Sequence, residues 1–197
     1  MRLFFRRKSG VSDLKTPRLR LVAMTPAMLE ADSARDGTLG AVLGARVTGE
    51  WPPADWEAHV LEMIFVQMAE LPSSTGWHRY VVLNELFTKR TLVGCVGGFP
   101  KADGVVEIGY STLPGFQRRG LGSEAALALV EWLLGQDGVR AVTAQAFRSI
   151  PESIKVMERC GMVLVGDGDD PGTVRYRRER TVVDGTVEGQ IVPRGTI

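Results

Sequence analysis

Residues 105–122, VVEIGYSTLPGFQRRGLG, decide the fold and point to its main functional feature. They predict a strand that ends near Thr112, a Pro/Gly loop, and a glycine-rich turn with two arginines. The turn leads directly into the most apolar helix expected in the chain, residues 121–134. Backbone amides in the first turn of a helix have no intrahelical partner and lie at the positive end of the helix dipole. We therefore expect this turn to bind an anionic group such as a phosphate.

Three phosphate-binding motifs can be compared with the turn. A P-loop requires Lys and then Ser or Thr after its last glycine, but Ser123 and Glu124 follow Gly122, so that motif is excluded. The turn also matches the residue pattern of a dinucleotide-binding fingerprint, G-x-G-x-x-A. Its context is wrong, because the strand ends too early and residues 142–145 contain no acid for a ribose. The third motif is Q-x-x-G-x-G after a splayed strand, which holds the pyrophosphate of coenzyme A.

Residues 117–122 resemble the acyl-CoA signature of the GNAT superfamily of N-acyltransferases, (Q/R)-x-x-G-x-(G/A). Three more segments resemble the branch of Rim-type ribosomal-protein N-terminal acetyltransferases. They are TPRLRL at 16–21, EIGY at 107–110, and SIKVMERCGM at 153–162, with Met162 in place of Phe. Four ordered segments are more specific than one glycine motif.

The resemblance implies that acetyl-CoA is the acyl donor. In the family, pantetheine enters a V-shaped opening between two diverging strands, for which residues 105–112 and 139–147 are the candidates. Gly109 in the first of these fits a β-bulge or a close backbone approach, and equally well a plain strand glycine. The residues expected to bind the donor are Ser111, Thr112, Gln117, Arg118, Arg119, Gly120, Leu121 and Gly122.

Glu107 is the candidate general base. An amine attacks only when neutral, and a lysine-type amine with a pKa of about 10.4 needs a proton acceptor. The resemblance places position 107 near the acceptor amine, where a carboxylate could act directly or through water. A half-exposed strand glutamate, or one that orients the substrate, is the alternative.

The helix expected at 151–160 departs from the family pattern. Family members often carry Asn-x-x-(Ser/Ala) and then a tyrosine four residues later, whereas this chain has Ile150, Ser153 and Met157. The usual general acid is therefore missing. Ser153 is the second candidate catalytic residue, since it could bond the sulfur or the pantetheine. It could also be a helix-terminal serine that bonds backbone. A CoA-binding module with weak or lost catalysis thus stays open as the alternative to an enzyme.

Length and composition agree with one globular domain. The chain has 197 residues, of which 44% are hydrophobic and 24% charged, with a net charge of +1. That charge gives no reason to expect nucleic acid or a membrane as partner. Cys95 and Cys160 lack metal-type spacing, no metal site is expected, and no apolar run approaches the roughly 18 residues of a membrane span. Cytoplasm is the default location.

We expect an α/β fold with a mixed, mostly antiparallel sheet of six or seven strands and helices on both faces. The domain should cover residues 14–180, with terminal extensions at 1–13 and 181–197. The acceptor is an amine of a small molecule or a protein N-terminus, and a homodimer stays open. The predicted strands are 18–23, 77–83, 91–99, 105–112, 139–147, 162–165 and 173–180. The other predicted helices begin after Thr25 and span 53–71 and 151–160, with a shorter one within 36–49.

Overall fold

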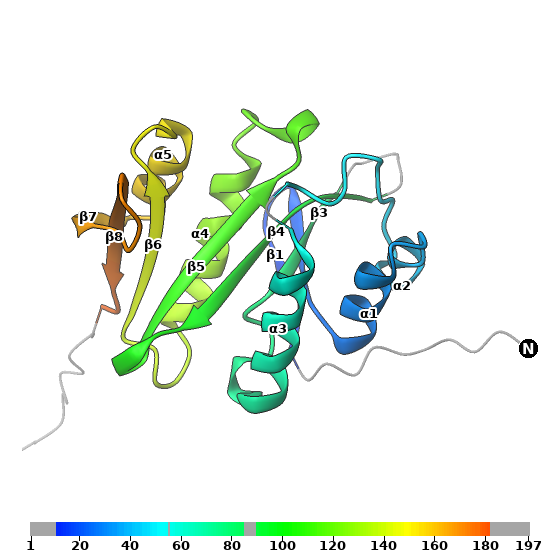
Figure 1. The fold of residues 1–197 in the computed structure, drawn as a ribbon, viewed down its shortest axis with the longest axis horizontal. Coiled ribbons are helices and arrows are strands. Elements are labelled where there is room, and N and C mark those ends of the chain that lie inside the picture. The colour runs from blue at the N-terminus through cyan, green and yellow to red at the C-terminus, as the bar shows by residue number, and fades with distance from the viewer. Residues whose placement is uncertain (1–10, 55, 85–89, 182–197) are drawn as a thin grey trace, which may run out of the picture.

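The computed structural model describes residues 11–54, 56–84 and 90–181, which form one eight-stranded sheet with helices on both faces (Figure 1). The strands are β1 (Leu14–Lys15), β2 (Leu19–Ala23), β3 (Arg79–Leu83), β4 (Thr91–Pro100), β5 (Val105–Thr112), β6 (Ala141–Phe147), β7 (Val163–Asp167) and β8 (Thr173–Glu179). The helices are α1 (Pro26–Ala34), α2 (Leu39–Leu43), α3 (Ala58–Glu70), α4 (Leu121–Leu134) and α5 (Pro151–Arg159). Short 3-10 turns lie at η1 (Pro72–Ser74), η2 (Ala102–Gly104) and η3 (Pro114–Phe116).

The sheet order is β1-β2-β3-β4-β5-β6-β8-β7. All neighbouring strands are antiparallel except β5 and β6, which run parallel. This parallel pair is short, because its register ends at Glu107 opposite Thr143. Beyond that position β5 continues to Thr112 and β6 to Phe147, and the two strands diverge (Figure 1). The sheet is therefore split at its centre, as the family resemblance implied.

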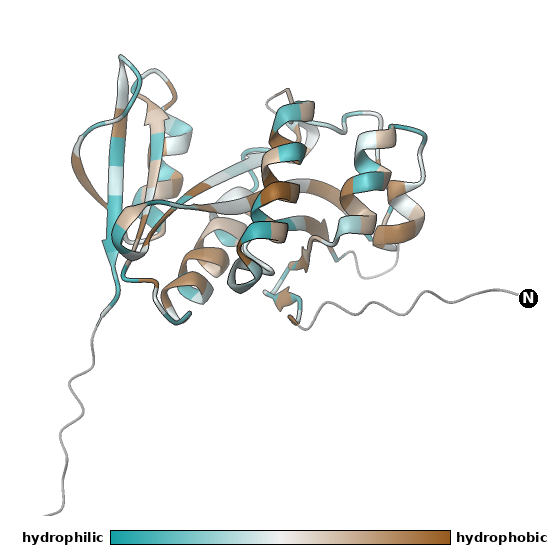
Figure 2. Ribbon diagram, turned by 60° about the horizontal axis from the view of Figure 1, so that its bottom comes forward, coloured by the Kyte–Doolittle hydropathy of each residue, from teal (hydrophilic) through white to brown (hydrophobic). Residues whose placement is uncertain are grey.

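Two separate hydrophobic cores lie on the two faces of the sheet. The face covered by α4 and α5 buries residues such as Leu21, Val106 and Leu129. The face covered by α1, α2 and α3 buries residues such as Met28, Ile64 and Tyr80. Figure 2 shows that apolar residues predominate in α4 and in the strands at the centre of the sheet, whereas β8 is largely hydrophilic. The bounds predicted for α4 are confirmed, and most of its residues are apolar, as expected of a helix packed against a sheet.

The strand count and the start of α3 differ from the prediction, and β3 and β6 each begin two residues later than predicted. The sheet has eight strands rather than six or seven, because β1 is a two-residue strand too short to show periodicity. Helix α3 begins at Ala58 rather than near 53. The preceding segment instead turns back, with the Trp56 amide donating to the Pro53 carbonyl at 2.9 Å, and Glu57 is extended with φ −83° and ψ 164°.

The remaining predictions concern the start of α1, the two ends of the chain and the β3–β4 connection. Thr25 caps α1 as expected, accepting a hydrogen bond from the Met28 amide. The loop expected around Lys89 lies outside the described residues, as do most of the two terminal extensions. The domain limits 14–180 therefore stay a prediction. Among the described helices, none is both long enough and apolar enough to cross a membrane.

Candidate active site

The glycine-rich turn adopts a backbone that only a few residue types accept easily. Gly120 is the N-cap of α4 with φ 75°, and Arg118 also has a positive φ of 56°. The Glu124 amide donates to the Gly120 carbonyl at 3.1 Å, so the helical hydrogen bonds start only there. The amides of residues 121–123 precede that bond and lie at the open end of the helix. They are the donors expected for a phosphate.

Side chains of the turn have structural roles that the sequence did not reveal. The side-chain nitrogen of Gln117, Nε2, donates to the Thr112 carbonyl at 2.9 Å and so joins the turn to the end of β5. A Cβ on Gly122 would lie 3.0 Å from Thr112 Oγ1, so this glycine allows close packing on the strand. Leu121 is buried in the core. Only its backbone amide can therefore face a ligand.

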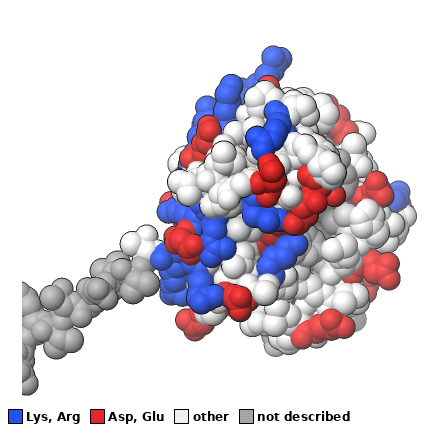
Figure 3. Space-filling model, turned by 60° about the vertical axis from the view of Figure 1, so that its left-hand side comes forward, with Lys and Arg blue, Asp and Glu red and all other residues white. Residues whose placement is uncertain are grey.

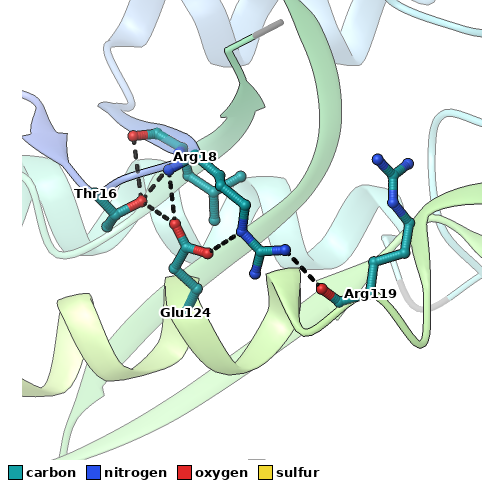
Figure 4. Close-up of polar contacts among 5 residues, drawn as sticks. Thr16, Arg18, Arg119 and Glu124 are labelled. Carbon is teal, nitrogen blue, oxygen red and sulfur yellow. Dashed lines mark hydrogen bonds and ion pairs between the residues drawn. The ribbon is translucent and has the colours of Figure 1, made fainter.

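A clamp between the N-terminal segment and α4 holds the turn in place (Figure 4). Glu124 Oε1 accepts hydrogen bonds from Thr16 Oγ1 at 2.5 Å and from the Arg18 amide at 3.0 Å. Arg18 Nε lies 2.6 Å from Glu124 Oε2, and Arg18 Nη1 donates to the Arg119 carbonyl at 2.8 Å. Burial acts to raise the pKa of Glu124, but the hydrogen bonds from Thr16 and Arg18 outweigh it and lower that pKa. Glu124 is therefore a charged anchor for the turn.

Basic side chains surround the same turn. Arg118 and Arg119 are exposed, and the Arg119 guanidinium lies 5.7 Å from the centre of the Phe116 ring. From α5, Arg159 Nη1 donates to Ser123 Oγ at 3.3 Å. Elsewhere on the face that carries α5 and β8, basic and acidic residues are interleaved (Figure 3). The turn is thus a local cationic site rather than part of one large positive surface.

Tyr110 of β5 and Ser153 of α5 are joined by hydrogen bonds. The Tyr110 hydroxyl lies 3.0 Å from the Ser153 carbonyl and 2.9 Å from Ser153 Oγ. Burial raises the pKa of Tyr110 to about 12, even though the hydrogen bond to Ser153 acts in the opposite direction. Tyr110 has no role among the predictions from the sequence. Its position in EIGY, on the strand face opposite to Glu107, is the signal that could have indicated one.

Position 157 does not contribute a group to the opening. Met157 has no exposed surface and packs in the core under α4 and α5. Ile150, where the family pattern has asparagine, is exposed at the start of α5. The structure thus places the hydroxyl of Tyr110, and not residue 157, beside Ser153.

Glu107 lies where β5 and β6 begin to diverge, with 22% of its side chain exposed. Both carboxylate oxygens have partners. Gln145 Nε2 donates to Oε2 at 2.8 Å, and Lys101 Nζ lies 3.1 Å from Oε1. The same Gln145 nitrogen also donates to Asp169 at 2.7 Å. Glu107 is therefore near the expected reaction centre, but in a network rather than isolated.

A cavity of about 240 Å³ lies on the α3 side of the sheet. Gly109 opens onto it, because a Cβ there would meet no other atom within 4 Å. Gly109 pairs in regular register with Gly97, so the suggested bulge is absent at this position. The lining comes from the segment before α3, from α3 and from β4 and β5, and includes Pro53, Trp56, Val60, Ile64, His78, Phe99 and Ser111.

One buried carboxylate holds the wall of this cavity. Asp32 in α1 is 1% exposed and accepts hydrogen bonds from four side chains. The donors are Trp51 Nε1 at 2.8 Å, Trp56 Nε1 at 2.7 Å, the Tyr80 hydroxyl at 2.9 Å and Arg35 Nη1 at 3.1 Å. Burial and the neighbouring Asp32 charge raise the pKa of Tyr80. Sequence reasoning missed Asp32, although it shares the buried face of α1 with Met28.

The architecture is that of a known family. Residues 18–163 match the model of the acetyltransferase (GNAT) domain. The chain therefore belongs to the GNAT acetyltransferase family. Within that class it is an acyl-CoA-dependent N-acetyltransferase, and acetyl-CoA is its acyl donor.

Individual relatives agree with this assignment. The chain is 29% identical over 153 residues to the uncharacterized N-acetyltransferase YjdG of Bacillus subtilis (strain 168), covering 77% of this chain and 89% of the relative. A GNAT-family acetyltransferase structure from Bordetella pertussis superposes with a TM-score of 0.61 at 20% identity, covering 85% and 99% of the two chains. RimL, the ribosomal L7/L12 α-N-protein acetyltransferase solved with coenzyme A, gives 0.56 at 14% identity over 85% and 98%. At 20% identity or less, these two structure matches show that the chain has the fold of these acetyltransferases.

Proposed function

We propose that the protein transfers the acetyl group of acetyl-CoA to a primary amine by direct attack, without a covalent enzyme intermediate. The observation that carries this proposal is the divergence of β5 and β6 after Glu107 and Thr143. Beyond this point the two strands no longer pair with each other, so backbone groups there can bond the pantetheine arm. The turn that leads into α4 follows the far end of β5, where the pyrophosphate would come next after the pantetheine.

The donor side would hold the phosphates with backbone amides and arginines. The first-turn amides of α4 supply oriented donors, and Arg118, Arg119 and Arg159 supply positive charge. Ser111 and Thr112 lie on the strand between the turn and the cavity, which is where the pantetheine would pass. The clamp at Glu124 keeps the turn in the required shape.

The acceptor side would be the cavity beneath α3. Its position over Gly109 brings it next to the point where the strands open, and therefore next to the thioester carbonyl. Trp56, Ile64 and Phe99 favour an acceptor whose amine carries an apolar group. Small molecules and protein N-termini both present such amines.

The chemistry assigns one role to each polar residue. The amine nitrogen attacks the thioester carbonyl carbon, and the tetrahedral intermediate then expels the thiolate as the C–S bond breaks. Glu107 would take the ammonium proton, directly or through water. Ser153 Oγ would donate a hydrogen bond to the leaving thiolate while the Tyr110 hydroxyl donates to Ser153. Tyr110 stays protonated, in keeping with its raised pKa.

Two measurements test the proposal. Acetyl-CoA at a hundredfold excess over Kd should stabilise the fold by about 2.7 kcal/mol, seen as a thermal shift. Thiol release should then depend on a primary amine in a panel that includes benzylamine, phenylalanine amide and spermidine. A shift with acetyl-CoA but no amine-dependent thiol release from any of them would instead support a CoA-binding module. Stabilisation by NADH and not by acetyl-CoA would support the dinucleotide motif.

A further inference from the structure

His78 is the most deeply buried titratable group that borders the cavity, among the residues the structure describes, and the proposed chemistry does not use it. It precedes β3 and is 3% exposed. Its ring lies edge-on to Phe99, with 4.8 Å between ring centres. Both residues line the cavity. His78 has no motif partner nearby in the chain, so no role for it is predicted from the sequence.

The hydrogen bonds of Gln67 fix which nitrogen of His78 carries the proton. Gln67 Nε2 donates to the Gly98 carbonyl at 3.0 Å, and a carbonyl can only accept. The other atom of the same amide, Gln67 Oε1, therefore faces His78 Nε2 at 3.2 Å. An amide oxygen can only accept, so Nε2 must carry the hydrogen. Nδ1 of the neutral ring then has a free lone pair and can act as an acceptor.

The accepting nitrogen lies over the glycine floor of the cavity. A Cβ built on Gly97 would be 2.2 Å from His78 Nδ1, which shows that the nitrogen sits directly above that glycine. Gly97 is the cross-strand partner of Gly109, the residue that opens onto the cavity beside the strand divergence. Nδ1 therefore lies over β4, and Gly109 of β5 lies between it and the opening between β5 and β6. An amine bound over Gly109 would lie between Nδ1 and the expected position of the thioester.

The ring stays neutral over the working pH range of most enzymes. Burial lowers the pKa of His78 to about 3. A neutral imidazole with such a low pKa is a poor proton acceptor, but it remains a good hydrogen-bond acceptor. It suits an amine that has already lost its extra proton, since burying an ammonium group without a counter-charge is costly.

We propose that His78 Nδ1 accepts a hydrogen bond from the neutral acceptor amine and aims the nitrogen lone pair at the thioester carbon. This rests on the proposed function, because it assigns the cavity to the acceptor. Gln67 is a positioning residue, since it holds the ring in the tautomer that leaves Nδ1 as acceptor. The proton of the attacked amine is left to Glu107 and solvent, and His78 takes no part in moving it.

Two isosteric variants separate this role from a purely structural one. In His78→Asn, the shorter amide places a polar atom near the position of Nδ1 and loses the Gln67 contact. In His78→Gln, the longer amide reaches toward Gln67 and leaves the Nδ1 position without an acceptor. We expect the amine KM to rise roughly tenfold more in His78→Gln than in His78→Asn, the size of one lost hydrogen bond. The acetyl-CoA thermal shift should be the same in both.

A structural role predicts the reverse order, because the Gln67 contact would then matter most. Equal amine KM values in the two variants, or a better His78→Gln enzyme, would overturn the proposal. Gly97→Ala provides a variant that keeps His78, because its Cβ would push the ring away from its position. It should raise the amine KM as His78→Gln does, and an unchanged KM counts against the proposal.

The tautomer can be measured without catalysis. A long-range proton–nitrogen NMR spectrum at pH 7 should show His78 neutral, with the proton on Nε2, and benzylamine should shift the Nδ1 resonance. A proton on Nδ1 overturns the inference even if the enzyme is active. If the wild type releases no thiol with any amine but Nδ1 shifts with benzylamine, the acetyl-transfer proposal fails while the binding role of His78 stands.

Discussion

The proposed donor side and the proposed acceptor side of this site are built in different ways. The donor side consists mainly of backbone: a turn and the first residues of one helix, held by the Thr16–Arg18–Glu124 clamp. The acceptor side consists of side chains from several elements, with Asp32 binding two tryptophans and a tyrosine at once. A site made of backbone groups tolerates most side-chain substitutions but few substitutions of its glycines. A side-chain site depends on individual polar groups. Substitutions on the two sides should therefore change different kinetic constants.

The largest effect should come from Glu107, which lies where β5 and β6 begin to diverge. Glu107→Gln should lower turnover by roughly 10²–10⁴-fold with little change in acetyl-CoA affinity, if it takes the amine proton. The loss should shrink as pH rises toward the pKa of the acceptor amine. Asp169→Asn is the matched control, because Asp169 accepts from the same Gln145 nitrogen. An equal loss of turnover at every pH would indicate that the Glu107 carboxylate has a structural or substrate-orienting role.

The donor side is tested by Gly120→Asp. This glycine has a positive φ and faces Arg18, with 3.4 Å between its hypothetical Cβ and Arg18 Nη2. An aspartate there would repel phosphate, so thermal stabilisation by acetyl-CoA should disappear, a loss of about 2–3 kcal/mol at a hundredfold excess over Kd. Gly138→Asp has nearly the same backbone strain, with φ 77°, at a site away from the turn. It should keep the full shift; a similar loss in both variants would mean that strain alone is responsible.

The acceptor side is tested by a pair of tryptophans. Trp51 and Trp56 each donate to Asp32, but only Trp56 lines the cavity. Trp51→Phe and Trp56→Phe should therefore destabilise the fold similarly, by about 1–3 kcal/mol for the lost buried hydrogen bond. Only Trp56→Phe should raise the amine KM, by several-fold to about tenfold, and steady-state kinetics at saturating acetyl-CoA would show it. An equal amine KM in both variants would mean that the cavity is not part of the acceptor site.

The smallest effect concerns the acid stability of the clamp. The folded-state pKa of Glu124 is lowered, so its contribution is present above its usual pKa of 4.5 and is lost as the pH falls through the folded value. Between pH 7 and pH 3, the unfolding free energy of Glu124→Gln should therefore fall less than that of the wild type. The difference should be about 1 kcal/mol or less, because the pair is partly exposed. Urea unfolding at the two pH values measures this. The exposed Glu131 on the same helix supplies the control variant Glu131→Gln, and an identical pH response of the two variants would contradict the role of the clamp.

The sequence predicted the strand, turn and helix of the proposed donor side well because these residues are close together in the chain. Periodicity and glycine spacing placed β5, the turn and α4 correctly, and the resemblance supplied the splayed strand. It could not predict Asp32, His78 or the Tyr110–Ser153 bridge, because each depends on contacts between distant segments. Trp56 illustrates the limit: its spacing fits the stripe of α3, but its bond to Asp32 belongs to a turn before the helix. Local patterns report helices and strands, and they do not report which buried polar groups meet.

The clamp also has a consequence for how the protein becomes able to bind its donor during synthesis. Arg18 and Glu124 are 106 residues apart in the chain. The earliest part of the domain to leave the ribosome must therefore wait for the middle of the chain before the phosphate turn can be fixed. A fragment that starts after Arg18, or one that ends before Glu124, holds only half of this contact. The turn proposed to bind the donor thus takes its shape from the assembled domain and not from its glycine motif alone.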